Sequence, residues 1–268
     1  MAAIPVEGNV LESYLRSEHI GQADRESDPQ VREYWQRGYI ALRGMFTRDE
    51  IAEWNRECDR LLKSDYVFPE NIRSPFRMNS GDRPERIDPV VDISEVFRKV
   101  TQDARIVDVV SKIFRDKPML FKDKLIFKAP GTDGYTPHQD QAYWQLCPAD
   151  DILSVSIQID GANAANGCIE LFPGYHDHLM TPPKQRMQLR EEDMAKIDAS
   201  KGEKIETQPG DVLIFHSLAP HGSAKNTDTT SRKSLYLTYS ASRNGDFYLR
   251  QLQNYIAYNF GGKTTQYK

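Results

Sequence analysis

Apolar residues in the first half of the chain recur at the three- and four-residue spacing of an amphipathic helix. Thr47 and Glu50 form a capping-box pair before one such run, which predicts a helix over about residues 48–62. A second run of the same period predicts a helical stretch over about residues 92–113. The segment between them, about residues 69–89, is rich in Pro, Asn, Ser and Gly and is predicted to be a loop.

The pattern changes after Pro118, where short runs with strand-forming residues follow one another between turn residues. These predicted strands cover about residues 119–128, 152–160, 168–172, 211–215 and 234–240. Apolar and polar residues alternate over 153–159 and 235–239, as expected for strands with one buried face. Many short strands at such intervals favour an antiparallel barrel or sandwich.

The predicted fold is mainly β with flanking α-helices, and its core is a double-stranded β-helix, the cupin-like jelly roll. No repeat, low-complexity tract or Gly/Ser linker marks a boundary, so one domain over residues 1–268 is expected. Within it, a helical part covers about residues 30–115 and the jelly-roll core about residues 118–245.

The composition is that of a soluble globular protein, with 39% hydrophobic and 28% charged residues. A formal net charge of -4 gives no electrostatic footprint for nucleic acid. No apolar run reaches the roughly 18 residues of a membrane-spanning helix, and no signal peptide is evident, so a cytoplasmic protein without a membrane partner is expected. Cys58, Cys147 and Cys168 are odd in number and widely spaced, which predicts buried reduced thiols rather than disulfides.

Three residues form a candidate metal site. His138 and Asp140 stand two positions apart, so in an extended segment both side chains lie on one face and can bind one ion. His221 follows the predicted strand 211–215 and supplies a third ligand. Two imidazole nitrogens and one carboxylate oxygen leave further positions open, as in Fe(II) oxygenases that bind a cosubstrate and O₂ together. Taken alone, a His-x-Asp pair also occurs commonly without any metal.

The other histidines leave alternatives open. His176 and His178 follow a Pro-Gly turn, which is typical of surface polar residues. His216 precedes His221 closely enough to be an alternative ligand or to support one.

A candidate cosubstrate site lies further along the chain. A 2-oxoglutarate oxygenase needs a buried cation for the far carboxylate of the cosubstrate, because an unpaired carboxylate is strongly disfavoured away from water. Arg232 stands at the start of the last predicted strand, where a guanidinium can form a bidentate pair. Ser223 can donate its hydroxyl to the same group. On its own, Arg232 is more typical of a solvated charge at a strand end.

An ordered set of short motifs runs along most of the chain. They are Lys128-Ala-Pro-Gly, His138-Gln-Asp-Gln-Ala-Tyr-Trp144, Asn166-Gly-Cys-Ile, Pro173-Gly-Tyr-His176, and His221-Gly-Ser223 with Arg232. Together they resemble the phytanoyl-CoA dioxygenase family, and Gly38-Tyr-Ile-Ala-Leu-Arg-Gly before the first predicted helix is similar as well. The likeness spans about residues 31–240. Two departures are Ala129, where the family often has Pro, and Tyr175, where Ser or Thr is usual.

The resemblance implies an Fe(II)- and 2-oxoglutarate-dependent dioxygenase that consumes O₂, hydroxylates its substrate and releases succinate and CO₂. It implies three metal ligands, namely His138, Asp140 and His221. It implies five cosubstrate contacts, namely Arg232, Ser223, Gln139, Lys124 and Arg86. Asp140 occupies the position that halogenating relatives vacate, which favours hydroxylation over halogenation.

The substrate side is expected near the metal. Five residues are candidates for its pocket, namely Trp144, Gln141, Tyr143, Asn166 and Arg77. Arg77 belongs to a loop, residues 72–86, in which arginines outnumber acidic residues. If this loop covers the pocket, it suits a carboxylate, phosphate or phosphonate group. A solvated loop and a core tryptophan explain the same residues equally well.

The expected function is therefore hydroxylation of a small polar metabolite, with an anionic group favoured. Examples of such substrates are an organophosphonate, an amino-acid derivative and a natural-product intermediate. One alternative is an acyl-CoA hydroxylase with the same chemistry, which would need a long apolar channel and a basic nucleotide site. The other is a cupin-like metal-binding protein without turnover.

Overall fold

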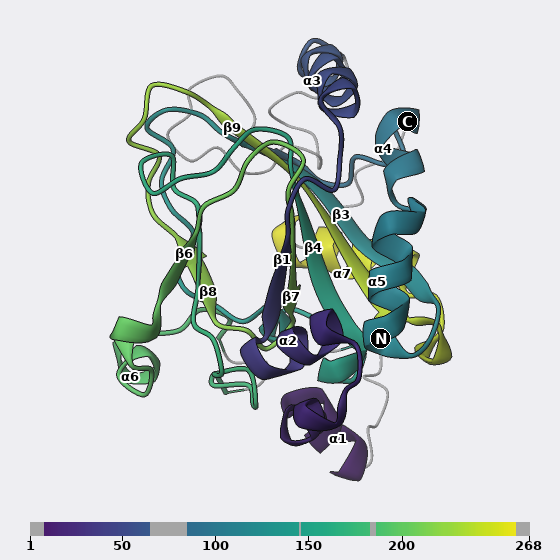
Figure 1. The fold of residues 1–268 in the computed structure, drawn as a ribbon, viewed down its shortest axis with the longest axis vertical. Helices are drawn as coiled ribbons and strands as arrows, with labels where there is room; N and C mark the ends of the chain where they lie inside the picture. The colour runs from purple at the N-terminus through teal and green to yellow at the C-terminus, as the bar shows by residue number, and fades with distance from the viewer. Residues whose placement is uncertain (1–7, 65–84, 145, 183–185, 261–268) are drawn as a thin grey trace.

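The fold consists of two antiparallel β-sheets with α-helices packed around them (Figure 1). The structure is a computed structural model that describes residues 8–64, 85–144, 146–182 and 186–260. The strands are β1 (Tyr39–Leu42), β2 (Arg86–Ile87), β3 (Pro118–Lys128), β4 (Ile152–Gln158), β5 (Ile169–Leu171), β6 (Glu203–Ile205), β7 (Val212–His216), β8 (His221–Ser223) and β9 (Arg232–Ala241). The α-helices are α1 (Gly8–Leu15), α2 (Pro29–Arg37), α3 (Arg48–Leu62), α4 (Glu95–Val100), α5 (Ala104–Phe114), α6 (Glu191–Met194) and α7 (Tyr248–Phe260). Short 3₁₀ helices are η1 (Ile20–Arg25), η2 (Asp140–Ala142), η3 (Ala149–Asp151), η4 (Ala199–Lys201) and η5 (Ser242–Asn244).

The larger sheet has six strands in the order β1-β7-β4-β9-β3-β2, and the smaller has three in the order β6-β5-β8. The pairing of β3 with β9 runs from Pro118 opposite Ala241 to Lys128 opposite Arg232. A cluster of apolar side chains with members from both sheets, such as Leu171 of β5 and Phe215 of β7, joins the two sheets. The predicted class, mainly β with flanking helices, is confirmed at this level.

The central strand β4 is buried on both of its faces. Leu153 and Val155 belong to the main core, which they share with residues of the helices. Ser154, Ser156 and Gln158 are buried on the opposite face, where Gln158 Nε2 donates to Ser156 Oγ at 2.8 Å. The alternation in this strand therefore separates an apolar core from a polar interior. The expectation that one face would meet solvent is wrong for β4.

The helices match the prediction in one place and depart from it in another. Helix α3 covers the predicted 48–62, and both halves of the capping box between Thr47 and Glu50 are present. The predicted stretch 92–113 is wrong as a single element, because it forms α4 and α5. Ser94 and Asp103 each accept a hydrogen bond from a backbone N–H in the following turn, so each starts a helix of its own.

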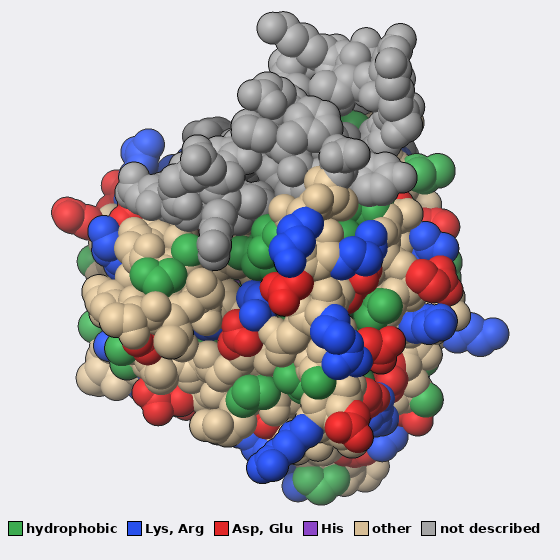
Figure 2. Space-filling model, turned by 90° about the horizontal axis from the view of Figure 1, so that it is seen from above, with side chains coloured by type: hydrophobic (Ala, Val, Ile, Leu, Met, Phe, Trp, Pro, Cys, Tyr) green, Lys and Arg blue, Asp and Glu red, His purple; other side chains and the backbone are tan. Residues whose placement is uncertain are grey.

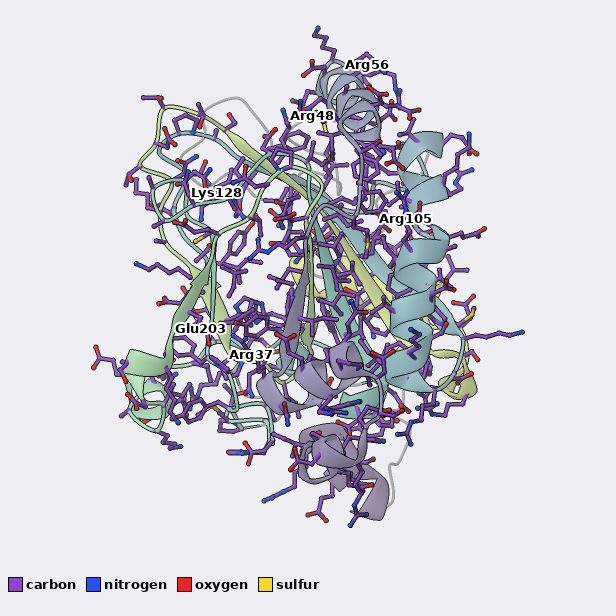
Figure 3. All side chains as sticks on the ribbon, in the orientation of Figure 1. Arg37, Arg48, Arg56, Arg105, Lys128 and Glu203 are labelled. Carbon is purple, nitrogen blue, oxygen red and sulfur yellow. The ribbon has the colours of Figure 1, made fainter. Side chains whose placement is uncertain are left out.

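Several elements lie outside the predicted ones, including α1, η1 and α2 at the N-terminal end and α7 at the C-terminal end. Arg37 in the last turn of α2 points to Glu203 of β6, with its Nη2 atom 2.5 Å from the carboxylate (Figure 3). Gly38 follows with a φ of 81°, and a Cβ there would come within 2.7 Å of His176. His176 is fully buried, so its expected surface position is wrong. Of the predicted loop 69–89, residues up to 84 lie outside the described part, and Arg86–Ile87 forms β2.

The surface and the thiols agree with the composition. All three cysteines are buried and free, as predicted. Figure 2 shows acidic and basic side chains interspersed over the described part of one face. None of the helices in the described ranges is both long enough and apolar enough to cross a bilayer.

Candidate metal centre

Three ligand-type side chains converge where a loop meets the smaller sheet. His221 begins β8, and His138 and His221 each donate a backbone N–H to the other's carbonyl, at 2.9 and 3.0 Å. Gln139 keeps the backbone extended, and Asp140 then starts η2. His138 and Asp140 therefore reach the same ion position, as predicted, although Asp140 lies in a 3₁₀ turn rather than in a strand.

The ligand atoms of His138, Asp140 and His221 lie within 4.8 Å of one another. Asp140 Oδ1 is 3.6 Å from His138 Nε2 and 3.9 Å from His221 Nε2. The Nδ1 atoms of His138 and His221 lie 2.8 and 2.9 Å from the carbonyls of Thr136 and Ala219. With Nδ1 protonated as the donor, each Nε2 keeps a lone pair for a metal. Two such nitrogens and one carboxylate oxygen fit Fe(II).

The electrostatics of the cluster suit metal binding. Burial and the neighbouring His138 lower the pKa of His221 to about 4, so its imidazole is neutral near neutral pH. Burial would raise the pKa of Asp140, but the attraction of His221 and His138 outweighs it and holds the pKa below its usual range. Ser154 of β4 donates a hydrogen bond to Asp140 Oδ2 at 2.9 Å. The carboxylate is thus ionised and oriented, with Oδ1 left for the ion.

A cavity of about 340 Å³ opens beside the cluster, and His138 and Asp140 form part of its wall. Tyr143 and Trp144, two of the residues predicted for the substrate pocket, form another part of this wall. The remaining lining includes three cations, which are Arg86, Lys122 and Lys124.

The three cations differ in their partners. Lys122 Nζ lies 2.8 Å from both carboxylate oxygens of Asp88. Arg86 Nε is 3.8 Å from Asp88, and its Nη2 donates to the hydroxyl of Tyr255 at 3.3 Å. Lys124 makes no hydrogen bond or ion pair within the described part of the chain, and burial lowers its pKa to about 8. Lys124 is therefore the cavity cation that is available to an anionic ligand.

A second group of charged and polar side chains, Arg232, Lys128 and Ser223, lies at the start of β9, and we call it the Arg232 cradle. Arg232 is 2% exposed, and its Nε and Nη1 atoms have no hydrogen-bond partner among the described residues. A buried guanidinium without partners is costly, which points to an anion in this place. Lys128, which pairs with Arg232 across strands β3 and β9, donates a hydrogen bond from its ammonium to Ser223 Oγ at 2.9 Å. Tyr135 lines the cavity and donates its backbone N–H to the same oxygen at 3.2 Å, which links the cradle to the cavity.

The family model of phytanoyl-CoA dioxygenase matches residues 34–234. This span is more than half of the 268 residues, and it includes the metal ligands, Ser223 and Arg232. The chain belongs to the phytanoyl-CoA dioxygenase family.

Relatives of this family member include enzymes that act on phosphonates. The methylphosphonate hydroxylase of Gimesia maris is 30% identical over 224 residues, which cover 82% of this chain and 83% of that protein. A 2-aminoethylphosphonate dioxygenase from an uncultured bacterium is 25% identical over 215 residues, which cover 78% and 79%. The crystal structure of EctD from S. alaskensis with 2-oxoglutarate and 5-hydroxyectoine shares the fold, with a TM-score of 0.74 at 23% identity. That match covers 82% of this chain and 77% of that one.

The phytanoyl-CoA dioxygenase family and the His-Asp-His cluster together define the enzyme class. The protein is a 2-oxoglutarate-dependent non-haem iron dioxygenase. The predicted family, class and cofactors are confirmed.

Gln139 and Gln141, which the sequence assigns to the cosubstrate and the substrate, stabilise the loop that carries His138 and Asp140. Gln139 is fully buried, and its Nε2 donates to the carbonyls of His178 and Leu218 at 2.8 and 2.7 Å. Gln141 is fully buried as well, and its Nε2 donates to the carbonyls of Tyr14 and Cys147 at 2.9 and 3.1 Å. Both side-chain amides therefore position the loop that carries His138 and Asp140, and neither residue is part of the cavity lining. The predicted contact of Gln139 with the cosubstrate, through its backbone or its amide, stays a prediction.

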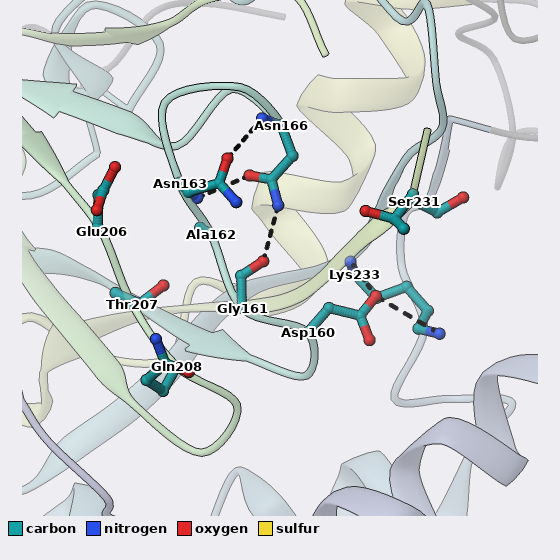
Figure 4. A pocket seen from close by; sticks show the side chains of 11 residues that line it. Asp160, Gly161, Ala162, Asn163, Asn166, Glu206, Thr207, Gln208, Ser231 and Lys233 are labelled. Carbon is teal, nitrogen blue, oxygen red and sulfur yellow. Dashed lines mark hydrogen bonds and ion pairs between the residues drawn. The ribbon is translucent and has the colours of Figure 1, made fainter. Parts of the chain in front are cut away.

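Asn166 lies at a different cavity, of about 600 Å³, which none of the three metal ligands lines (Figure 4). Its Oδ1 accepts the backbone N–H of Asn163 at 2.8 Å, and Lys233 pairs with Asp160 at 3.5 Å. Asn166 thus stabilises a turn. It does not line the metal-facing cavity, where its predicted substrate role would place it. Arg77 lies outside the described residues.

The residues around the site that were not predicted include Lys122, Lys128, Gln251 and Tyr255. A signal existed for Lys122, since it stands two positions before Lys124 in a predicted strand and so shares its face. Gln251 and Tyr255 stand one helical turn apart, but nothing in the sequence places that turn against the cavity.

Proposed function

We propose that this dioxygenase hydroxylates a small anionic metabolite and that an organophosphonate is the favoured substrate class. The observation that carries the proposal is Lys124, a cation without an acidic partner within the described chain, on the same cavity wall as His138 and Asp140. The activities of the two relatives, a methylphosphonate hydroxylase and a 2-aminoethylphosphonate dioxygenase, support this substrate class. The cavity of about 340 Å³ is also near the small end of the roughly 300–1,000 Å³ typical of ligand pockets, which disfavours an acyl-CoA.

Each protein group has a defined task in this proposal. His138, Asp140 and His221 hold the iron, which with 2-oxoglutarate and O₂ supplies the oxidation of a substrate C–H bond to C–OH, with succinate and CO₂ as co-products. Arg232 pairs with the distal carboxylate of 2-oxoglutarate, because its buried donors lack other partners in the described structure. Ser223 donates its hydroxyl to the same carboxylate.

The cavity residues orient the reacting molecules. Lys124 and Arg86 present positive charge to the keto-acid end of the cosubstrate and to the anionic group of the substrate, which occupy neighbouring positions beside the metal. Tyr143 and Trp144 form the apolar wall of the substrate position.

The finer architecture belongs to the same proposal. The apolar cluster shared by the two sheets supports their closure into a double-stranded β-helix, or jelly roll, around the site. One domain over residues 1–268 is proposed, because strands and helices from both halves of the chain contribute to the main core.

The enzyme proposal is tested in two stages. Under argon, Fe(II) with 2-oxoglutarate should give a weak visible charge-transfer band that His138→Ala abolishes. On admission of O₂, one member of a panel of phosphonates and carboxylates should increase succinate release. A band without succinate for any panel member would instead support a metal-binding protein without turnover.

Removal of Arg232 tests the cosubstrate site. In Arg232→Ala the KM for 2-oxoglutarate should rise about tenfold to a hundredfold, because charge-assisted hydrogen bonds contribute about 1.5–3 kcal/mol. The control is Arg56→Ala, which changes an exposed arginine on α3 and should leave this KM unaltered. Steady-state succinate formation measures both, and an unchanged KM in Arg232→Ala would remove Arg232 from the cosubstrate site.

A further inference from the structure

The C-terminal helix α7 forms part of the cavity wall, although it lies beyond the residues that the family model matches. That match ends at residue 234, whereas α7 covers Tyr248–Phe260 and packs against β3 (Figure 1). Gln251 and Tyr255 line the same cavity as His138 and Asp140, and they are 7% and 9% exposed. A segment outside the common family core therefore reaches the metal-facing cavity.

The start of α7 is fixed to the strand that carries the cavity cations. The hydroxyl of Tyr248 donates to Asp123 Oδ2 at 2.6 Å. Asp123 Oδ1 accepts the backbone N–H groups of Val90 and Val91 at 2.6 and 2.9 Å. Asp123 lies between Lys122 and Lys124 in β3, so this contact sets the position of the helix relative to both lysines.

Tyr255 organises one group of charges on this wall. Its hydroxyl accepts a hydrogen bond from Arg86, and its ring centre lies 4.2 Å from Lys122 Nζ, within cation–π distance. Arg86 and Lys122 also share Asp88 as an acidic partner. These two cations are therefore partly neutralised where they stand.

Gln251 differs from these neighbours because no described residue forms a hydrogen bond with its side-chain amide. It is more than nine-tenths buried, lines the cavity and makes no side-chain hydrogen bond within the described part of the chain. An amide that stays unpaired in such a place loses free energy unless a ligand satisfies it. Lys124, whose ammonium contacts the ring of Tyr236 but has no ion-pair partner among the described residues, supplies the matching positive charge on the same cavity.

We propose that α7 is the specificity element of the cavity, with Gln251 donating its amide N–H to the anionic group of the substrate. Lys124 balances the charge of that group, and Tyr255 is a positioning residue for Arg86 and Lys122. The inference rests on the proposed function, because it states where an anionic substrate such as a phosphonate is held. A phosphonate offers three oxygens, so it can accept from an amide and an ammonium together.

The test uses the near-isosteric change Gln251→Glu, which replaces the donor by a negative charge. Its matched control is Gln253→Glu, the same change at an exposed position of α7. The probe is methylphosphonate, titrated by calorimetry into protein that holds Fe(II) and 2-oxoglutarate under argon. Binding should weaken at least about tenfold in Gln251→Glu and stay unchanged in Gln253→Glu. Titration of the charge-transfer band should show unaltered 2-oxoglutarate affinity in both variants.

The other outcomes separate this inference from the function on which it rests. If wild type binds methylphosphonate and Gln251→Glu binds it equally well, the role of α7 is wrong while the substrate class stands. If Gln251→Glu loses 2-oxoglutarate affinity by the same factor, Gln251 serves the cosubstrate and the inference is again wrong. If wild type binds neither methylphosphonate, 2-aminoethylphosphonate nor inorganic phosphate, the anionic substrate class falls and the role of α7 falls with it.

Discussion

Ser223 has a hydroxyl proton that the surrounding hydrogen bonds leave available. Its oxygen already accepts from the Lys128 ammonium at 2.9 Å and from the Tyr135 backbone at 3.2 Å, which uses both acceptor positions. The hydroxyl can therefore only donate, which suits the proposed contact of Ser223 with the distal carboxylate of 2-oxoglutarate. Burial and the adjacent Arg232 lower the pKa of Lys128 to about 8, so a bound carboxylate would relieve a repulsion between the two cations.

Lys128→Met should weaken the cosubstrate site while keeping the volume of the side chain. Without the ammonium, Ser223 loses a donor that orients it and the site loses a charge. We expect the KM for 2-oxoglutarate to rise about tenfold, in line with the loss of one charged hydrogen bond. Lys225→Met, at an exposed lysine in the next loop, is the control and should behave as wild type. An unaltered KM in Lys128→Met would show that Ser223 is positioned without it.

Among the helices and strands, the sequence predicted those whose stabilising contacts lie within the segment itself. The helix at 48–62 was predictable because its cap and its apolar stripe both lie within the segment. The break between α4 and α5 was missed because Asp103 becomes a cap only when the backbone before it leaves the helix. The alternation of apolar and polar residues in β4 was predicted correctly. Its polar face is nevertheless buried, because it packs against the segment that carries Asp140, and the sequence of β4 alone does not reveal this packing.

The short helix η1 is held to η3 by an ionisable pair. Just before it, His19 Nδ1 lies 2.8 Å from Asp150 Oδ2, and Asp150 Oδ1 lies 3.1 Å from His216 Nε2. The hydrogen bond to Asp150 raises the pKa of His19, although burial opposes the shift. Of the more distant charges, Asp151 raises this pKa and Arg115 lowers it.

The docking of this segment should weaken as the pH rises. Because folding raises the pKa of His19, the stabilisation is fully present below the ordinary value of 6.5 and is lost as pH rises through the folded value. Amide hydrogen exchange over residues 18–25, corrected for intrinsic rates, should show less protection at about pH 8.5 than at about pH 6. His19→Gln should remove this dependence, whereas His178→Gln, at a half-buried histidine beside Asp177, should keep it. Equal protection at both pH values in wild type would disprove the pairing.

At the scale of the whole molecule, the site joins segments that are distant in the sequence. The convergence of His138, Asp140 and His221 could be predicted from their residue types and order along the chain, and the structure brings the three together. The role of Arg232 at the cosubstrate stays a prediction, which its buried donors without partners among the described residues support. The roles of Gln139 and Gln141 could not, since an amide near a ligand serves equally well to bind a cosubstrate or a backbone carbonyl. The contact of Tyr255 with Arg86 depends on tertiary packing alone.

The three metal ligands, His138, Asp140 and His221, also connect the two sheets, so a bound ion should stabilise the fold. His221 begins β8 in the smaller sheet, and Asp140 is held by Ser154 in the larger one. An ion that binds only the folded state stabilises it by about 2.7 kcal/mol at a hundredfold excess over its Kd. For a chain of this size that corresponds to a rise of about 5–10 °C in Tm.

Mn(II) is a suitable probe because it resists oxidation in air, and differential scanning calorimetry gives the Tm. The rise should appear in wild type and in the control His178→Ala, and it should vanish in His138→Ala. 2-Oxoglutarate should raise the Tm further only after the metal is present, because its keto-acid end binds the ion. A full rise in His138→Ala would place the ion elsewhere, and an equal effect of 2-oxoglutarate without metal would show that the Arg232 cradle binds it independently of the triad.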